Sequence, residues 1–256
     1  MHFIKVTPKV ILSTIDAVDP DQFLHILSAV NQEKNKSPTS PFDPNQRKFD
    51  WIFRNMDFIE WNTTTHSEVL LVCGPPDCHI HKVSSHIVDE AKKNAFALYF
   101  FCSTVAMESS VETVFVHALL HQIICDLPPA RKKLTIAVFF RTLVDAISSG
   151  EFSWYKEEDP LDEKIRTILN VTDPDCHWKA LDAVLVNGRK QELFIIIDGL
   201  DKVQDRVPIY KFIARQHMRF SKVKAFITST CHLWTEIPAI HCRITSIEYD
   251  KERKGS

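Results

Sequence analysis

Two segments of this chain carry residues suited to nucleotide chemistry. Residues 74–82, Gly-Pro-Pro-Asp-Cys-His-Ile-His-Lys, follow an apolar run, where a phosphate-binding loop would lie. A second apolar run, residues 193–198, ends in Asp198 and is followed by Asp201. An acidic residue at the carboxyl end of a central strand can hold magnesium beside a bound nucleotide. The spacing therefore predicts a nucleotide-binding fold, and its function depends on how well the loop still holds phosphate.

The loop lacks most of the groups that phosphate needs. A working loop, G-x-x-x-x-G-K-[ST], uses glycines for close backbone approach, a lysine for charge and a hydroxyl for magnesium. With Gly74 as the first glycine, the other three positions hold His79, Ile80 and His81. Lys82 cannot replace the lysine, because two residues along a helix rotate a side chain by roughly 200°. One lost charged contact costs about 1.5–3 kcal/mol, so we expect no tight ATP binding.

The candidate nucleotide site is this degenerate loop together with the acidic strand end: Gly74, Pro75, Pro76, Asp77, Cys78, His79, Ile80, His81, Lys82 and Asp198. Asp198 would ligate magnesium only with nucleotide bound. Asp198 and Asp201 are vestigial catalytic positions, since Lys202 stands where a further acidic residue would complete the set. Two alternatives stay open: the loop is a plain strand-to-helix turn, or one of the aspartates only caps a helix start.

The elements that must position these residues alternate along the chain. We predict strands at 67–73, 95–102, 192–198 and 223–229, with a weaker one near 240–247, and helices at 81–93, 110–126, 130–148, 176–187 and 206–219. Short apolar strands separated by helices are typical of a mainly parallel sheet covered on both faces. The predicted fold class is therefore α/β, a three-layer α/β/α sandwich. The polar stretch 150–175, with Asp-Pro twice, is predicted to be a surface excursion.

The N-terminal part is predicted to be a separate helical segment. Residues 9–32 have helical spacing, with Pro20 dividing two helices, and the proline-rich residues 33–47 form a linker. An aromatic-rich short helix is then expected before the first strand. This gives two domains, 1–47 and 48–256.

Bulk composition excludes several classes of protein. The chain has 256 residues, 45% of them hydrophobic, and a net charge of −2, which gives no sign of nucleic-acid or membrane-surface binding. Seven irregularly spaced cysteines favour a reducing compartment. No apolar stretch approaches the ~20 residues that span a bilayer. We predict a soluble cytoplasmic protein.

Taken in chain order, the strands, loop and helices predicted above resemble a NACHT domain of the STAND group of P-loop NTPases, of the type in fungal NOD-like receptors. The likeness runs over roughly residues 48–253 and rests on the aromatic lead-in, the strand and loop start, Leu193–Asp201, the 226–232 strand and the closing 247–253 segment. It implies an ATP/ADP-dependent switch coupled to oligomerisation and to a fused effector. It also implies helical and winged-helix regions after residue 253, so we expect either a fragment or a protein without them.

The departures from the family pattern form a consistent set. The loop lysine and hydroxyl are replaced by Ile80 and His81, the acidic residue after Asp201 by Lys202, and the usual sensor arginine by Thr230. The leading hypothesis is a pseudo-ATPase that serves as a signalling or scaffold module, with protein partners that include a second copy of itself, no cofactor, and no nucleic acid or membrane. The second hypothesis is a weak ATP/ADP-binding switch that uses magnesium.

Metal chemistry is the third hypothesis. Several possible ligands crowd the loop: Cys73, Cys78, His79, His81 and His86. Their spacing fits no common zinc pattern, and Cys73 is expected to point into the core. His117 and His121 stand at i, i+4 on one helix without a nearby third ligand, so we expect a plain helix face. A Cys78–His81 hydrolase lacks an identifiable orienting acid.

Overall fold

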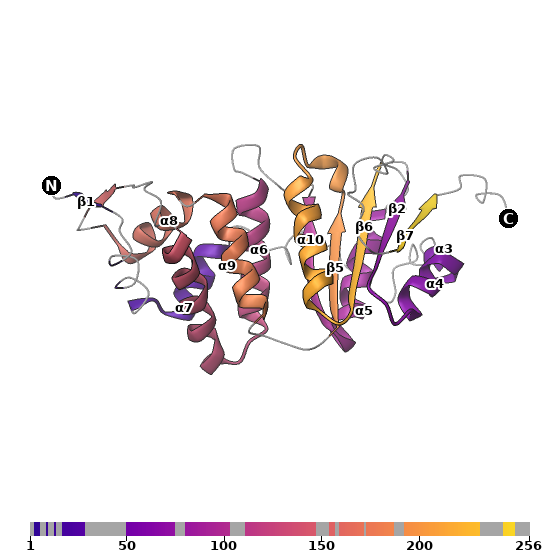
Figure 1. Cartoon of the computed structure of the whole chain (residues 1–256), viewed down its shortest axis with the longest axis horizontal. Helices are drawn as coiled ribbons and strands as arrows, with labels where there is room; N and C mark the ends of the chain where they lie inside the picture. Colours follow the sequence, from indigo (N-terminus) through magenta and orange to yellow (C-terminus); the bar gives the residue numbers. More distant parts are fainter. Residues whose placement is uncertain are drawn as a thin grey trace. The chain divides into compact units, whose positions relative to one another are not determined.

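The computed structural model of the protein describes residues 3–5, 9, 13, 17–28, 50–74, 80–102, 111–146, 154–156, 159–171, 173–186, 192–230 and 243–248. The chain divides into two compact units (Figure 1). One combines Met1–Asn31 with Glu112–Arg189, and the other combines Gln32–Val111 with Lys190–Ser256. The candidate site belongs to the second unit. The domain boundary after residue 47 stays a prediction.

The second unit is built on a parallel sheet. Among the described residues it has five strands: β2 (Glu68–Cys73), β3 (Phe96–Phe101), β5 (Leu193–Asp198), β6 (Val223–Ser229) and β7 (Arg243–Glu248). Their order is β3-β5-β6-β2-β7, and every neighbouring pair is parallel. The five predicted strands and the α/β fold class are confirmed. Because β6 lies between β2 and β5, the loop strand and the acidic strand are not neighbours, yet both end at the same edge.

Helices cover both faces of this sheet, which gives the three layers (Figure 1). Helix α5 (Ile80–Asn94) packs on one face, where its apolar residues join alternate residues of four strands in a single core cluster. Helix α10 (Val207–Arg219) lies on the opposite face and contacts β6 through a side that buries Ile209, Phe212 and Ile213. β2, β3 and β6 are buried along their whole length, and β2 and β3 are almost entirely apolar because both of their faces are covered.

Two short helices precede β2 where we predicted one. α3 (Asp50–Arg54) and α4 (Met56–Thr63) are separated by Asn55, whose backbone is extended. The Asn55 side chain accepts a hydrogen bond from the Asp57 amide at 2.8 Å and so caps α4. Phe58 and Trp61 are buried against the sheet, as the aromatic lead-in predicted.

The first unit is mainly helical. Its elements are β1 (Phe3–Lys5), α2 (Pro20–Leu27), α6 (Val111–Cys125), α7 (Pro129–Ala146), β4 (Trp154–Lys156), α8 (Leu161–Val171) and α9 (Pro174–Val186). α7 packs against α9, α2 contacts α7 and α8, and β1 pairs with β4 in antiparallel fashion. Pro20 lies in the first turn of α2, after the N-cap Asp19. The predicted linker, 33–47, and most of the predicted helix before Pro20 lie outside the described residues.

The prediction of a surface excursion at 150–175 is wrong. This stretch contains β4 and α8, and α8 buries Ile165, Ile168 and Leu169 along one face. That i, i+3, i+4 spacing is the pattern of an amphipathic helix. The two Asp-Pro pairs mark helix starts instead of loops, as at Asp173, whose carboxylate accepts the Asp175 amide at 2.8 Å. Polar residues on the exposed face of α8 hid this pattern.

Candidate functional site

The predicted strand and helix that flank the loop are both present, with the strand ending at the carboxyl edge of the sheet. β2 ends at Cys73, and the Gly74 amide donates to the Ser229 carbonyl at 3.1 Å, which continues the β2–β6 pairing by one residue. α5 begins at Ile80. Residues 75–79 of the predicted loop, Pro75 to His79, lie outside the described residues. The structure therefore fixes the residues at which the loop begins and ends, Gly74 and Ile80.

The first residues of α5 include Ile80, which aligns with the lysine of a working phosphate-binding loop. Ile80 is 9% exposed and belongs to the core cluster between α5 and the sheet. His81 is exposed and Lys82 is half-buried. The position that aligns with the phosphate-binding lysine thus contributes apolar packing.

Asp198 is held inside the protein by two hydroxyl groups. Its side chain is 4% exposed, and its Oδ1 accepts hydrogen bonds from Ser84 Oγ and from Thr228 Oγ1, both at 2.7 Å. Thr228 Oγ1 in turn accepts the Gly199 amide at 2.8 Å. Gly199 has a φ of +71°, which favours glycine and lets the chain turn directly after the strand. These contacts join α5, β5 and β6 at one carboxylate.

Burial shifts the pKa of this carboxylate. It raises the pKa of Asp198, and hydrogen bonds from Ser84 and Thr228, with the nearby His81, offset only part of that rise. The alternative that Asp198 caps a helix is wrong. The short helix η7 (Leu200–Lys202) starts after Gly199, with no side-chain cap.

Asp201 accepts two hydrogen bonds from Thr230, the residue that the resemblance placed at the sensor position. The Thr230 amide donates to Asp201 Oδ1 at 3.0 Å, and Thr230 Oγ1 donates to Oδ2 at 2.5 Å. Lys202 Nζ lies 3.6 Å from the same Oδ2. Partial burial acts to raise the pKa of Asp201, but the Thr230 hydrogen bonds and Lys202 outweigh it and lower the pKa. Asp201 therefore stays ionised and paired within the protein.

The family model for the nephrocystin 3 N-terminal domain matches residues 47–230, well over half of the chain. The chain belongs to this family. That family is associated with NACHT-containing proteins. No curated protein matched the chain. The match includes the loop strand β2, the acidic strand β5 and β6, so the carboxyl edge described above lies within the nephrocystin 3 N-terminal domain.

Sequence reasoning missed three side chains of the site in this nephrocystin 3 N-terminal domain. Ser84 and Thr228 donate hydrogen bonds to Asp198, and Cys102 directly follows Phe101, the β3 residue that pairs with Asp198. Burial, with the charges of Asp198 and Asp201, raises the pKa of Cys102 well above its usual value, so the thiol stays protonated. Ser84 follows His81 by three residues and so shares its helix face, which is the one signal that sequence offered.

The metal hypothesis gains no support from the part of the chain that the structure describes. Within it, no group of three or more His, Cys, Asp or Glu side chains is arranged to hold a metal ion. Cys73 is buried, as predicted, whereas Cys78 and His79 lie outside the described residues. In the first unit, His117 Nε2 lies 3.3 Å from His177 Nδ1, a contact that the prediction of a plain helix face missed.

Within the described ranges, no helix is both long and apolar enough to cross a bilayer.

Replacing Ile80 with lysine tests whether this position can still serve a phosphate. We expect Ile80→Lys to lower the free energy of unfolding by about 2 kcal/mol, because an amine replaces core methyl groups. The matched control, Ile80→Val, should cost about 0.5–1 kcal/mol. Urea unfolding at pH 7 measures both, and nucleotide titration of Ile80→Lys should show no new binding. A lysine variant as stable as the parent that binds ATP would show that residue 80 faces the loop.

Proposed function

We propose that this chain is a degenerate NACHT-like domain, a pseudo-ATPase that acts as a signalling or scaffold interaction module. Its partners are proteins, a second copy of the chain among them, and its ATP hydrolysis is lost or very weak. The family match and the parallel α/β fold support a P-loop-like signalling domain. The pseudo-ATPase assignment goes further and rests on the chemistry of the site.

The observation that carries the proposal is the state of Asp198 and Ile80. The carboxylate that would hold magnesium through water is buried, and one of its oxygens accepts two protein hydroxyls. The residue in place of the phosphate-binding lysine is part of the hydrophobic core. Magnesium–ATP therefore fits these residues poorly, because its outer phosphates find no lysine at residue 80 and Asp198 Oδ1 already accepts two hydrogen bonds from the protein.

The direct test is isothermal titration of the chain with ATP and with ADP, each with magnesium. We expect no saturable heat up to about 1 mM nucleotide, which is a binding free energy weaker than about −4 kcal/mol. Phosphate release should equal that of buffer. Micromolar binding with measurable turnover would contradict the proposal.

A second candidate, an ATP/ADP-binding switch, is favoured by one feature of the fold. The strand β2 and the helix α5 flank the loop as in a phosphate-binding site, and Asp198 lies at the sheet edge where β2 ends. Helix N-termini attract phosphate through their free amides and dipole. If this candidate holds, ADP raises the melting temperature of the parent chain, and Asp198→Ala abolishes that rise. The ligand-induced rise is the readout, because the substitution alters the melting temperature by itself.

A further inference from the structure

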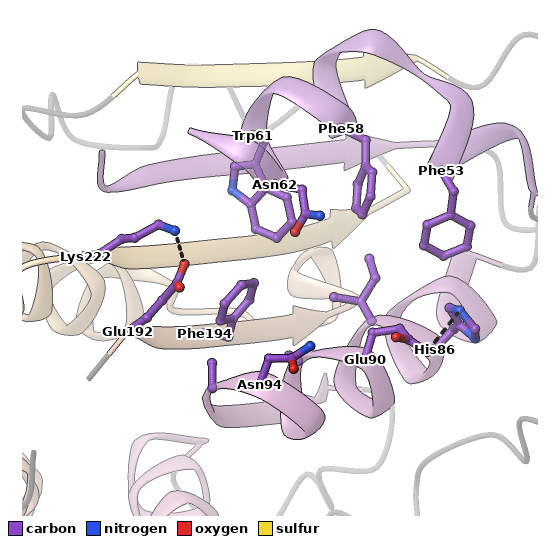
Figure 2. Close-up of a pocket in the computed structure, with 13 residues that line it drawn as sticks. Phe53, Phe58, Trp61, Asn62, His86, Glu90, Asn94, Glu192, Phe194 and Lys222 are labelled. Atoms are coloured by element: carbon purple, nitrogen blue, oxygen red, sulfur yellow. Dashed lines mark ion pairs between the residues drawn. The ribbon is translucent and has the colours of Figure 1, made fainter. Parts of the chain in front are cut away.

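A cavity of about 480 Å³ opens at the other edge of the sheet, away from Asp198 (Figure 2). Its lining includes residues that immediately precede three strands: Asn94 and Ala95 before β3, Glu192 before β5 and Lys222 before β6. In a parallel sheet these amino ends share one edge. The volume lies within the range of roughly 300–1,000 Å³ typical of small-ligand sites. All of its lining belongs to the second unit.

One wall of the cavity is aromatic. Phe53 of α3, Phe58 and Trp61 of α4, and Phe194 of β5 line it (Figure 2). Neighbouring rings touch in edge-to-face or tilted arrangements, with centroids 5.3 Å apart for Phe53 and Phe58 and 5.9 Å for Trp61 and Phe194. Phe53 and Phe194 pack against the core cluster but are only partly buried. Aromatic faces carry partial negative charge, so the exposed parts of Phe53 and Phe194 attract cations.

The cavity also has polar side chains that can accept hydrogen bonds. Glu90 lies on α5, and the carboxamides of Asn62 and Asn94 come from α4 and α5 (Figure 2). Neither carboxamide hydrogen-bonds to another side chain within the described ranges. The lining cation Lys222 is engaged, because its Nζ lies 2.5 Å from Glu192 Oε1. Of the two lining carboxylates, Glu90 is therefore the one that Lys222 does not neutralise.

Glu90 is held only by weak, exposed contacts, so a ligand cation can replace its present partners. Its Oε1 pairs with Lys93 Nζ at 2.5 Å, and the side chains of Glu90 and Lys93 are 49% and 62% exposed. Exposed pairs of this kind contribute about 0–1 kcal/mol. His86 Nε2 lies 4.0 Å from the same oxygen, with its ring against Phe53. A ligand cation can therefore take over Glu90 at little cost.

We propose that this cavity binds an organic cation, a guanidinium group on an apolar stem. The stem would lie against the aromatic wall, and the planar guanidinium would donate to Glu90 and to the oxygens of Asn62 and Asn94. The proposal stands independently of the nucleotide question, because no residue of this cavity belongs to the carboxyl edge.

Binding of N-acetyl-arginine amide, measured by isothermal titration or saturation-transfer NMR, tests the site. The neutral isostere N-acetyl-citrulline amide is the matched ligand control, and we expect the cation to bind at least about tenfold more tightly. Glu90→Gln, at a half-exposed position, should weaken cation binding about fivefold or more without unfolding the protein. Glu163→Gln, at an exposed position of α8 in the other unit, should change nothing.

Two further ligands distinguish the source of the cation. If agmatine binds as tightly as an arginine within a short peptide, the site takes a free small cation. If the peptide binds at least about tenfold more tightly, the site reads a protein arginine. Either result supports the site. Equal affinity for citrulline and arginine, unchanged affinity in Glu90→Gln, or no binding of arginine amide at millimolar concentration would overturn it.

Discussion

Replacing Asp198 with alanine is expected to lower the free energy of unfolding by about 2–4 kcal/mol, because two buried hydroxyls lose their shared acceptor. Ser84 Oγ and Thr228 Oγ1 both donate to Asp198 Oδ1, and these contacts join α5, β5 and β6. Alanine leaves both donors inside the protein with a small cavity between them. Urea unfolding at pH 7 measures the loss.

Asp198→Asn is the informative companion variant. Asparagine keeps an oxygen for the two hydroxyls and removes a buried charge, so we expect a loss below about 1 kcal/mol, or a gain. The sign follows from the pKa: burial raises it, so the carboxyl group adds stability at low pH that is lost as the pH rises through the folded-state pKa. The stability difference between parent and Asn variant should thus move in favour of the parent on acidification. An Asn variant as unstable as alanine would show that the negative charge is needed.

This pair of variants bears on function as well as stability. A carboxylate kept for magnesium needs its charge, whereas one kept as a hydroxyl acceptor does not. Tolerance of asparagine at position 198 would fit the pseudo-ATPase proposal. The variant is also nearly isosteric, so a change in stability can be assigned to charge and hydrogen bonding.

Strands were predictable because both faces of this sheet are buried. A strand covered on both sides is mostly apolar, so β5 and β6 stand out in the sequence as Leu193–Asp198 and Val223–Ser229, even though β6 also buries Lys224. α5 was likewise predicted to within one residue at each end, from its helical spacing. The acidic strand end was found for the same reason: Asp198 is the first charge after an apolar run.

The partners of Asp198 were not predictable, because they depend on strand order. Thr228 reaches Asp198 only because β6 pairs with β5, and no local pattern specifies that pairing. Ser84 lies one helical turn beyond the position where a hydroxyl was sought. Gly199 contributes through its left-handed backbone, which composition alone does not reveal. Local propensity located the elements, and long-range packing determined the site.

The missed helix α8 has a different cause. Its apolar residues Ile165, Ile168 and Leu169 are few among charged neighbours, so average polarity suggested a loop. Spacing carried the signal that composition obscured. The Asp-Pro pairs were assigned to turns, although proline fits the first turn of a helix, where its missing amide has no partner to lose.

Acidification is expected to destabilise the helical unit through His117. This side chain of α6 is buried beside His177 of α9, and the two ring nitrogens lie 3.3 Å apart. Burial, and then the proximity of His177, lowers the pKa of His117 to about 3. Between pH 6.5 and that value the unfolded chain takes up a proton at this residue and the folded chain does not. Stability is therefore lost as the pH falls through this range.

The expected loss of unfolding free energy from His117 alone is about 2 kcal/mol between pH 7 and pH 5. Each pH unit below the pKa of the unfolded chain costs about 1.4 kcal/mol while the folded chain stays unprotonated. Urea unfolding followed by circular dichroism at both pH values measures it. His117→Gln keeps an amide that can hydrogen-bond to His177 and does not titrate, so its loss on acidification should be smaller than the parent's by that amount. His25→Gln, at an exposed position of α2, is the control and should leave the parent's difference unchanged to within about 0.5 kcal/mol. If His117→Gln and the parent lost the same stability, the imidazole would have to be accessible to protons in the folded state, and the packing of α6 against α9 would need revision.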